Sequence, residues 1–156
     1  MENGAVFNFQ QQDENGMSII FKAAAQGDTK LIELLINLQQ SPWQKCPNFG
    51  RTIFHYAAMN NKKDLIEFII KRFTKLDPLF INAEDFKGFT ALAYAAEGDY
   101  WDVFKLLQTK LDANIAHISV VDGLTILHRA CFAKNKSLLE KLLAQKCKIS
   151  ELDRDN

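Results

Sequence analysis

A pattern that recurs four times along the chain limits the folds open to this sequence. Each copy has a glycine, a hydroxyl residue two positions later, then an apolar position and a pair of small residues. The glycines are Gly16, Gly50, Gly88 and Gly123, separated by 34, 38 and 35 residues. A period of roughly 20 to 50 residues indicates stacked structural repeats.

The repeated positions predict the local structure of each copy. A glycine suits the positive φ of a tight hairpin turn, and a serine or threonine two residues later is a good N-cap for a following helix. These hydroxyl residues are Ser18, Thr52, Thr90 and Thr125. The first helix is expected to end near Gly27, Asn61, Asp99 and Lys134. Lysine suits a left-handed terminal residue least well among these four types.

A second helix follows in each copy. Apolar pairs recur four residues apart, as in Leu65-Ile66 and Ile69-Ile70, which is the stripe of an amphipathic helix with one buried face. Helix, turn, helix and hairpin therefore make a unit of about 34 residues. We predict an all-α helical repeat solenoid with four helix-turn-helix units and hairpin loops.

The pattern resembles the ankyrin repeat, whose units read Gly-x-Thr-Pro-Leu-His-x-Ala-Ala before a leucine-rich second helix. The resemblance covers about residues 13 to 150. The family's histidine remains only as His55 and His128. Its proline is replaced in all four units, by Ile19, Ile53, Ala91 and Ile126. The resemblance implies an ankyrin-type solenoid that recognises a partner protein.

The repeats divide the chain into a flank and one repeat domain. Residues 1–12 form the N-terminal flank, and the ankyrin-like domain covers 13–156. Its expected units are about 13–46, 47–84, 85–119 and 120–152, with the start of a fifth at 153–156. Because the chain reaches a fifth hairpin, we expect further residues in the parent protein, unless Lys141 and its neighbours cap the last unit. The long segment Phe73 to Glu84 is predicted to contain an irregular turn at Asp77-Pro78.

Composition narrows the function classes. The 156 residues include 19 Lys and Arg against 19 Asp and Glu, so we expect no nucleic-acid partner, because phosphate binding requires an excess of cations. No apolar run approaches the roughly 18 residues of a membrane span. Three cysteines at no framework spacing indicate free thiols, so we expect an intracellular protein, cytoplasmic or nuclear.

Catalytic and metal-binding hypotheses depend on three histidines. His55 and His128 stand three residues after Thr52 and Thr125, where an imidazole can bond the cap and tie adjacent hairpins together. His128 and Cys131 supply at most half of a zinc site, which needs four ligands, and Cys131 fills a small core position. Phosphate-binding and hydrolase motifs are missing from the sequence. We therefore predict no enzyme, no cofactor or metal, and no small-molecule substrate.

Apolar residues at variable positions predict a binding surface. In ankyrin-like stacks the residue after each hairpin glycine and the end of each first helix line the concave face. Aromatic and arginine side chains dominate binding energy at interfaces, and an exposed apolar groove marks a partner site; a loosely packed core is the alternative. The predicted partner-binding residues are Met17, Phe49, Arg51, Met59, Phe86, Phe89, Leu124 and Phe132.

The sequence as a whole therefore predicts a protein–protein interaction module that binds a partner protein through its concave face and hairpin tips. Low Pro and Gly with frequent Lys, Asn, Ile and Phe is typical of host-directed effectors of intracellular bacteria or viruses, which would act in the host cytosol. Three alternatives remain open. They are an interaction domain of a longer protein with its enzymatic or regulatory segment elsewhere, a self-associating structural repeat, and a small metal-dependent enzyme.

Overall fold

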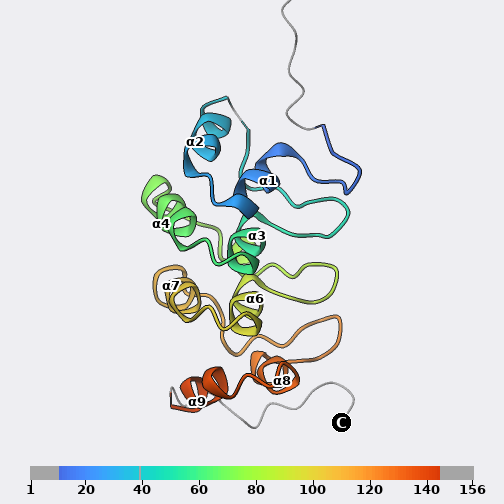
Figure 1. Ribbon diagram of the computed structural model, residues 1–156, viewed down its shortest axis with the longest axis vertical. Coiled ribbons are helices and arrows are strands. Elements are labelled where there is room, and N and C mark those ends of the chain that lie inside the picture. Colours follow the sequence, from blue (N-terminus) through green and yellow to red (C-terminus); the bar gives the residue numbers. More distant parts are fainter. Residues whose placement is uncertain (1–10, 39, 145–156) are drawn as a thin grey trace, which may run out of the picture.

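The computed structural model describes residues 11–38 and 40–144, which form two rows of stacked helices with hairpin loops beside the first row (Figure 1). The first row contains α1 (Ile19–Gln26), α3 (Ile53–Met59), α6 (Ala91–Glu97) and α8 (Ile126–Phe132). The second row contains α2 (Thr29–Asn37), α4 (Lys63–Arg72), α7 (Trp101–Leu111) and α9 (Lys136–Ala144). The prediction of an all-α solenoid with four helix pairs is confirmed. Within the described residues, β-pairing is limited to two isolated bridges, Gln12 with Ser18 and Ile118 with Thr125.

The repeated glycines and hydroxyl residues have the predicted conformations. The four hairpin glycines have φ between 68° and 77°. The four hydroxyl residues are the N-caps of α1, α3, α6 and α8. At Gly88 a Cβ would also collide with Ser119 and Val121 of the next hairpin. Glycine is therefore required there both by the backbone conformation and by the close approach of neighbouring hairpins.

Each first helix ends one or two residues before the predicted left-handed residue, and φ is 76°, 54°, 55° and 53° at Gly27, Asn61, Asp99 and Lys134. Lys134, the least suited residue type, is followed by Asn135, which fixes the turn. Its Oδ1 accepts the backbone N–H of Leu138 at 3.0 Å, and its Nδ2 donates to the carbonyl of Ala96 at 3.2 Å. These two hydrogen bonds offset the cost of the left-handed lysine, which is of order 1 kcal/mol.

The core runs between the two rows and continues from one helix pair to the next. Ala57, Ala58, Ala95 and Ala96 are completely buried, and their small size allows α3 and α6 to pack closely against each other. Phe54 and Phe104 are completely buried.

None of the described helices is long and apolar enough to cross a membrane.

The segment predicted as an irregular turn is instead a single helical turn, α5 (Pro78–Ile81). Asp77 caps this turn, because its Oδ1 accepts the backbone N–H of Leu79 at 2.9 Å, and Pro78 suits the first helical position. The Phe80 ring then packs edge-on against Trp43, with the ring centroids 5.3 Å apart. Local capping and an aromatic contact together explain why the segment is helical.

Several sequence predictions concern the two ends of the chain. The start of a fifth unit at 153–156, most of the N-terminal flank and Cys147 lie outside the described residues. Lys141, which interrupts the apolar face of α9, packs against the third helix pair. Its Nζ lies 5.0 Å from the centroid of the Trp101 ring and 4.0 Å from Asp99 Oδ1. A cation–π contact and a weak ion pair therefore accommodate this charge.

Candidate functional site

A buried ionic cluster joins the second and third repeats on the hairpin side. Asp85 opens the third hairpin, and its Oδ1 accepts the backbone N–H groups of Lys87 and Phe89 at 2.9 and 3.0 Å. Its Oδ2 accepts Arg51 Nε at 3.1 Å and Tyr94 Oη at 2.7 Å. Burial raises the pKa of Asp85, but the bonds from Tyr94, the Phe89 backbone and Arg51 outweigh it and lower that pKa overall.

Arg51, a predicted partner-binding residue, lies inside this cluster. Its Nη2 donates to Tyr94 Oη at 2.9 Å, and its guanidinium carbon lies 5.0 Å from the Phe49 ring centroid and 5.4 Å from that of Tyr94. Only 13% of the side chain is exposed. Arg51 thus holds two repeats together and leaves little surface for a partner.

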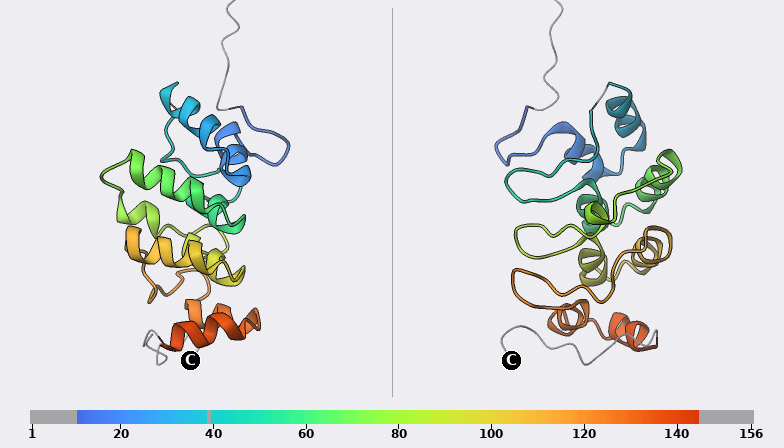
Figure 2. Two further views of the ribbon diagram at one scale, coloured as in Figure 1. Left: turned by 60° about the vertical axis from the view of Figure 1, so that its left-hand side comes forward. Right: turned by 180° about the vertical axis from the view of Figure 1, so that it is seen from behind.

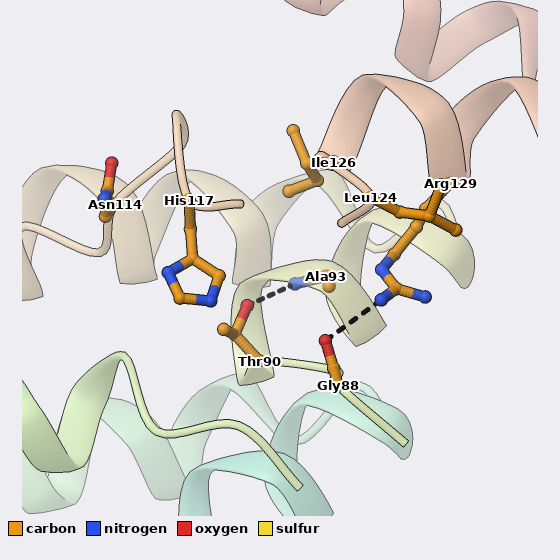
Figure 3. Close-up of a pocket in the computed structure, with 8 residues that line it drawn as sticks. All are labelled: Gly88, Thr90, Ala93, Asn114, His117, Leu124, Ile126 and Arg129. Carbon is orange, nitrogen blue, oxygen red and sulfur yellow. Dashed lines mark hydrogen bonds between the residues drawn. The ribbon is translucent and has the colours of Figure 1, made fainter. Parts of the chain in front are cut away.

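A similar cluster joins the third and fourth repeats. Arg129 reaches from α8 to the third hairpin, where its Nη2 donates to the Gly88 carbonyl at 3.0 Å (Figure 3). The same guanidinium binds the carboxylate of Asp122 at 2.9 and 3.0 Å and lies 3.7 Å from the centroid of the Phe89 ring. Phe89 also stacks on Tyr94, with centroids 4.8 Å apart. The Phe89 ring is therefore packed between an arginine and a tyrosine.

This packing leads to a prediction for Phe89. We expect Phe89→Ala to lower the free energy of unfolding by about 2 kcal/mol, because a half-buried ring with two packed neighbours is lost. Urea denaturation followed by circular dichroism measures the change. Phe86→Ala is the matched control and should change it by less than about 0.5 kcal/mol, since Phe86 is exposed. Equal stability of the two variants would contradict the packing role of Phe89.

His55 ties the second repeat to the third. The backbone N–H of Thr52 donates to His55 Nδ1 at 3.0 Å, so the proton of the neutral ring lies on Nε2, which donates to the Phe89 carbonyl at 2.9 Å. Burial lowers the pKa of His55 to about 4, against the raising effect of the Phe89 bond. The predicted structural role is confirmed for His55. His128 Nδ1 accepts the backbone N–H of Thr125 at 3.2 Å and lies 2.9 Å from Thr125 Oγ1, and both contacts are within its own repeat.

The predicted partner-binding residues differ in how much surface they present. Phe132 is 72% exposed and Phe86 is 66% exposed. The other six are half-buried: Met17, Phe49, Arg51, Met59, Phe89 and Leu124. Phe86 and Phe132 therefore offer the largest free apolar surfaces of the predicted set.

Sequence reasoning included Leu124 of the fourth hairpin but missed three other apolar residues there. Val120 is 65% exposed and Val121 57% exposed, and Ile118 beside them is also exposed. Phe86 belongs to the neighbouring third hairpin, whose Gly88 lies against Val121. We call Phe86, Ile118, Val120 and Val121 the hairpin patch. The sequence did contain a signal for this surface. Val120 and Val121 are apolar, β-branched residues in the turn of the fourth hairpin, whereas the turn of the first hairpin carries Glu14 and Asn15.

A small cavity lies between the third and fourth repeats (Figure 3). It is lined by Gly88, Thr90, Ala93, Asn114, His117, Leu124, Ile126 and Arg129. Its volume of about 10 Å³ suffices for one water molecule at most. Among these lining residues, His117 is already engaged, because its Nε2 lies 2.6 Å from Glu84 Oε1. Across residues 11–38 and 40–144, no group of three His, Cys, Asp or Glu side chains is arranged to hold a metal ion.

Comparison with known proteins identifies the family. The family model described as ankyrin repeats (3 copies) matches residues 2–78 and 20–119. The chain belongs to the ankyrin-repeat family. Ankyrin repeats are protein-interaction modules.

A solved structure agrees with the ankyrin fold. It is a chain from the crystal structure of the yeast ribosomal protein Rps3 in complex with its chaperone Yar1, with a TM-score of 0.74. The two chains are 22% identical, and the match covers 86% of this chain and 94% of that chain. At this identity the likeness shows the shared fold of stacked helix pairs.

Proposed function

We propose that this ankyrin-repeat protein binds a partner protein through the concave face of its first-row helices and the tips of its hairpins. The observation that supports this most directly is that the hairpin patch, and Phe132 at the end of the first-row helix α8, expose apolar side chains. Exposed apolar surface of this kind marks interaction sites in soluble proteins. Aromatic side chains such as Phe86 and Phe132 act as anchors, since they bury a large area at low entropic cost.

The clusters around Asp85 and Arg129 support this function indirectly. They hold the second, third and fourth hairpins in fixed relative positions through buried charged hydrogen bonds. A preorganised surface loses less entropy on binding than a flexible one. Exposed Glu14 in the first hairpin and Glu97 at the end of α6 supply negative charge and would favour a partner segment with basic residues.

The test is affinity capture of partner proteins from a eukaryotic cell lysate, with matched variants of this chain as bait. We expect Phe86→Ala combined with Phe132→Ala to weaken capture at least about tenfold, or about 1.4 kcal/mol, with an unchanged melting midpoint. The control combines Leu34→Ala with Leu143→Ala, two exposed leucines of second-row helices, and should capture normally. Normal capture by the phenylalanine variant, or equal loss in both variants, would contradict the proposed surface.

Sizing chromatography separates this proposal from self-association. A chain that elutes as a monomer across the concentrations of the capture experiment supports a heterologous partner, whereas a dimer broken by the phenylalanine variant identifies a second copy as the partner.

We assign no catalytic role. The free thiols of Cys46 and Cys131 fit an intracellular setting. Neither the fold nor the comparisons support a host-directed effector role, so the proposal is limited to partner binding.

A further inference from the structure

The longest spacing between repeats builds a pocket away from the hairpins. The extra residues lie between α4 and α6 and include α5, which Figure 2 shows as a short yellow-green helix between α4 and α7. An open pocket of about 320 Å³ lies here, at the C-terminal ends of α4 and α7. Its apolar lining consists of Ile70, Phe73, Leu76, Pro78, Ile81 and Leu111.

The shape and lining of the pocket suit a bulky apolar group. Of the lining residues, Ile81 and Leu111 are buried, while Phe73 and Leu76 are half-buried. Leu79, on the outer side of α5, is 82% exposed. Pockets for small-molecule ligands range from roughly 300 to 1,000 Å³, so a pocket at the lower end of this range has room for one or two large side chains of a partner.

Four exposed cations belong to the segments that line the pocket. They are Lys71, Arg72, Lys75 and Lys110. Lys110 is itself a lining residue, and the other three are sequence neighbours of lining residues on α4 and the loop after it. Within residues 11–38 and 40–144, none of the four lies at ion-pair distance from a carboxylate. Lysine and arginine are favourable at helix C-termini, but Lys75 lies in the loop beyond α4, so the positive charge extends past the helix ends.

Two nearby carboxylates offset part of this positive charge but do not cancel it. Asp77 is engaged by the backbone N–H of Leu79, and Asp112 lines the pocket on the side of α7. The segments 70–81 and 110–112 together carry four positive and two negative side chains, in a chain whose formal net charge is zero. The guanidinium carbon of Arg72 lies 5.6 Å from the centroid of the Phe73 ring, so this charge stands directly beside a lining residue. Cations without a carboxylate partner next to an apolar pocket are complementary to an acidic segment that carries an apolar side chain.

We propose that this pocket, lined by the ends of α4 and α7 and by α5, is a second docking site that binds an acidic peptide segment of a partner protein through a bulky apolar anchor. The anchor enters the apolar lining, and carboxylates on either side of it meet Lys71, Arg72, Lys75 and Lys110. This inference goes beyond the proposed function, since it uses a different face of the molecule. A concave site with a partly apolar lining and a net charge of about two is poorly suited to a nucleic-acid backbone, which needs many cations.

The probe is a capped, fluorescein-labelled peptide in which one Trp and one Leu stand among glutamates. We expect saturable binding to the full chain, measured by fluorescence anisotropy, that weakens as salt is raised. Lys71→Glu combined with Lys75→Glu should weaken it at least about tenfold. Thr74→Trp, which fills the mouth of the pocket from an exposed position, should do the same without removing a core contact.

The matched control reverses two exposed charges elsewhere, Lys30→Glu with Lys87→Glu, and should bind the peptide like the unmodified chain. Melting midpoints from circular dichroism ensure that all variants are folded. The proposal is overturned if the control loses as much affinity as the pocket variants, or if Thr74→Trp binds normally. Equal binding of a peptide with Ser in place of Trp and Leu would also overturn it, as would pocket-dependent binding of phosphatidylserine vesicles without peptide binding. Phe86→Ala with Phe132→Ala should leave peptide binding intact, so the two surfaces are tested separately.

Discussion

Replacement of Asp85 by alanine is expected to lower the free energy of unfolding by about 3 to 5 kcal/mol. The change removes the carboxylate that pairs with Arg51 and accepts the hydroxyl proton of Tyr94. The guanidinium then remains between aromatic rings, largely out of water and without a counter-charge. The backbone N–H groups of Lys87 and Phe89 also lose their acceptor, which adds an unsatisfied-donor cost.

Two further variants make this prediction specific. Asp85→Asn keeps an oxygen that can accept the backbone N–H groups but removes the charge, so it should cost less than Asp85→Ala. Glu33→Ala, at an exposed position of α2, should change stability by less than about 0.5 kcal/mol. Urea denaturation measures all three. A loss below about 1 kcal/mol for Asp85→Ala would show that the cluster does not stabilise the stack.

The second large effect is a pH dependence that originates at His55. Burial lowers the pKa of His55 to about 4 in the folded chain, whereas an unfolded histidine has a pKa of about 6.5. Between these values the unfolded chain binds a proton that the folded chain does not. The free energy of unfolding should therefore keep its highest value above about pH 6.5. It should fall by up to about 3 kcal/mol as the pH is lowered to about 4.

His55→Gln tests the origin of this slope. The variant should be less stable at pH 7, because the bond to the Phe89 carbonyl is lost or weakened, yet its stability should vary little between about pH 6.5 and 4.5. His128→Gln retains His55 and should retain the slope. The lowered pKa values of Asp85 and Asp122 act at lower pH, since their stabilisation is lost only as the pH falls below about 4. An unchanged slope in His55→Gln would contradict the assignment.

The helices and hairpins could be predicted from sequence because each depends on residues close together in the chain. A hairpin glycine and the hydroxyl two residues later fix the turn and the helix start within one unit. The same locality explains why the end of the fourth first-row helix was correctly predicted near Lys134, although lysine suits this position poorly. The repeat pattern fixes the length of each first helix. The helical turn α5 was not predicted, because the Asp77 cap needed support from the packing of Phe80 on Trp43, which is distant in sequence.

The free and the packed aromatic residues could be separated only by the tertiary structure. Phe86 and Phe89 are the same residue type in one hairpin, yet Phe86 is exposed while Phe89 lies against Arg129 from the next repeat. Arg51 likewise meets Asp85 only because the second and third hairpins stack. The sequence alone determined the repeat, its caps and its family, since these follow from local backbone preferences. The stacking of neighbouring repeats decided which side chains remain available to a partner, because burial is set by residues about one repeat away.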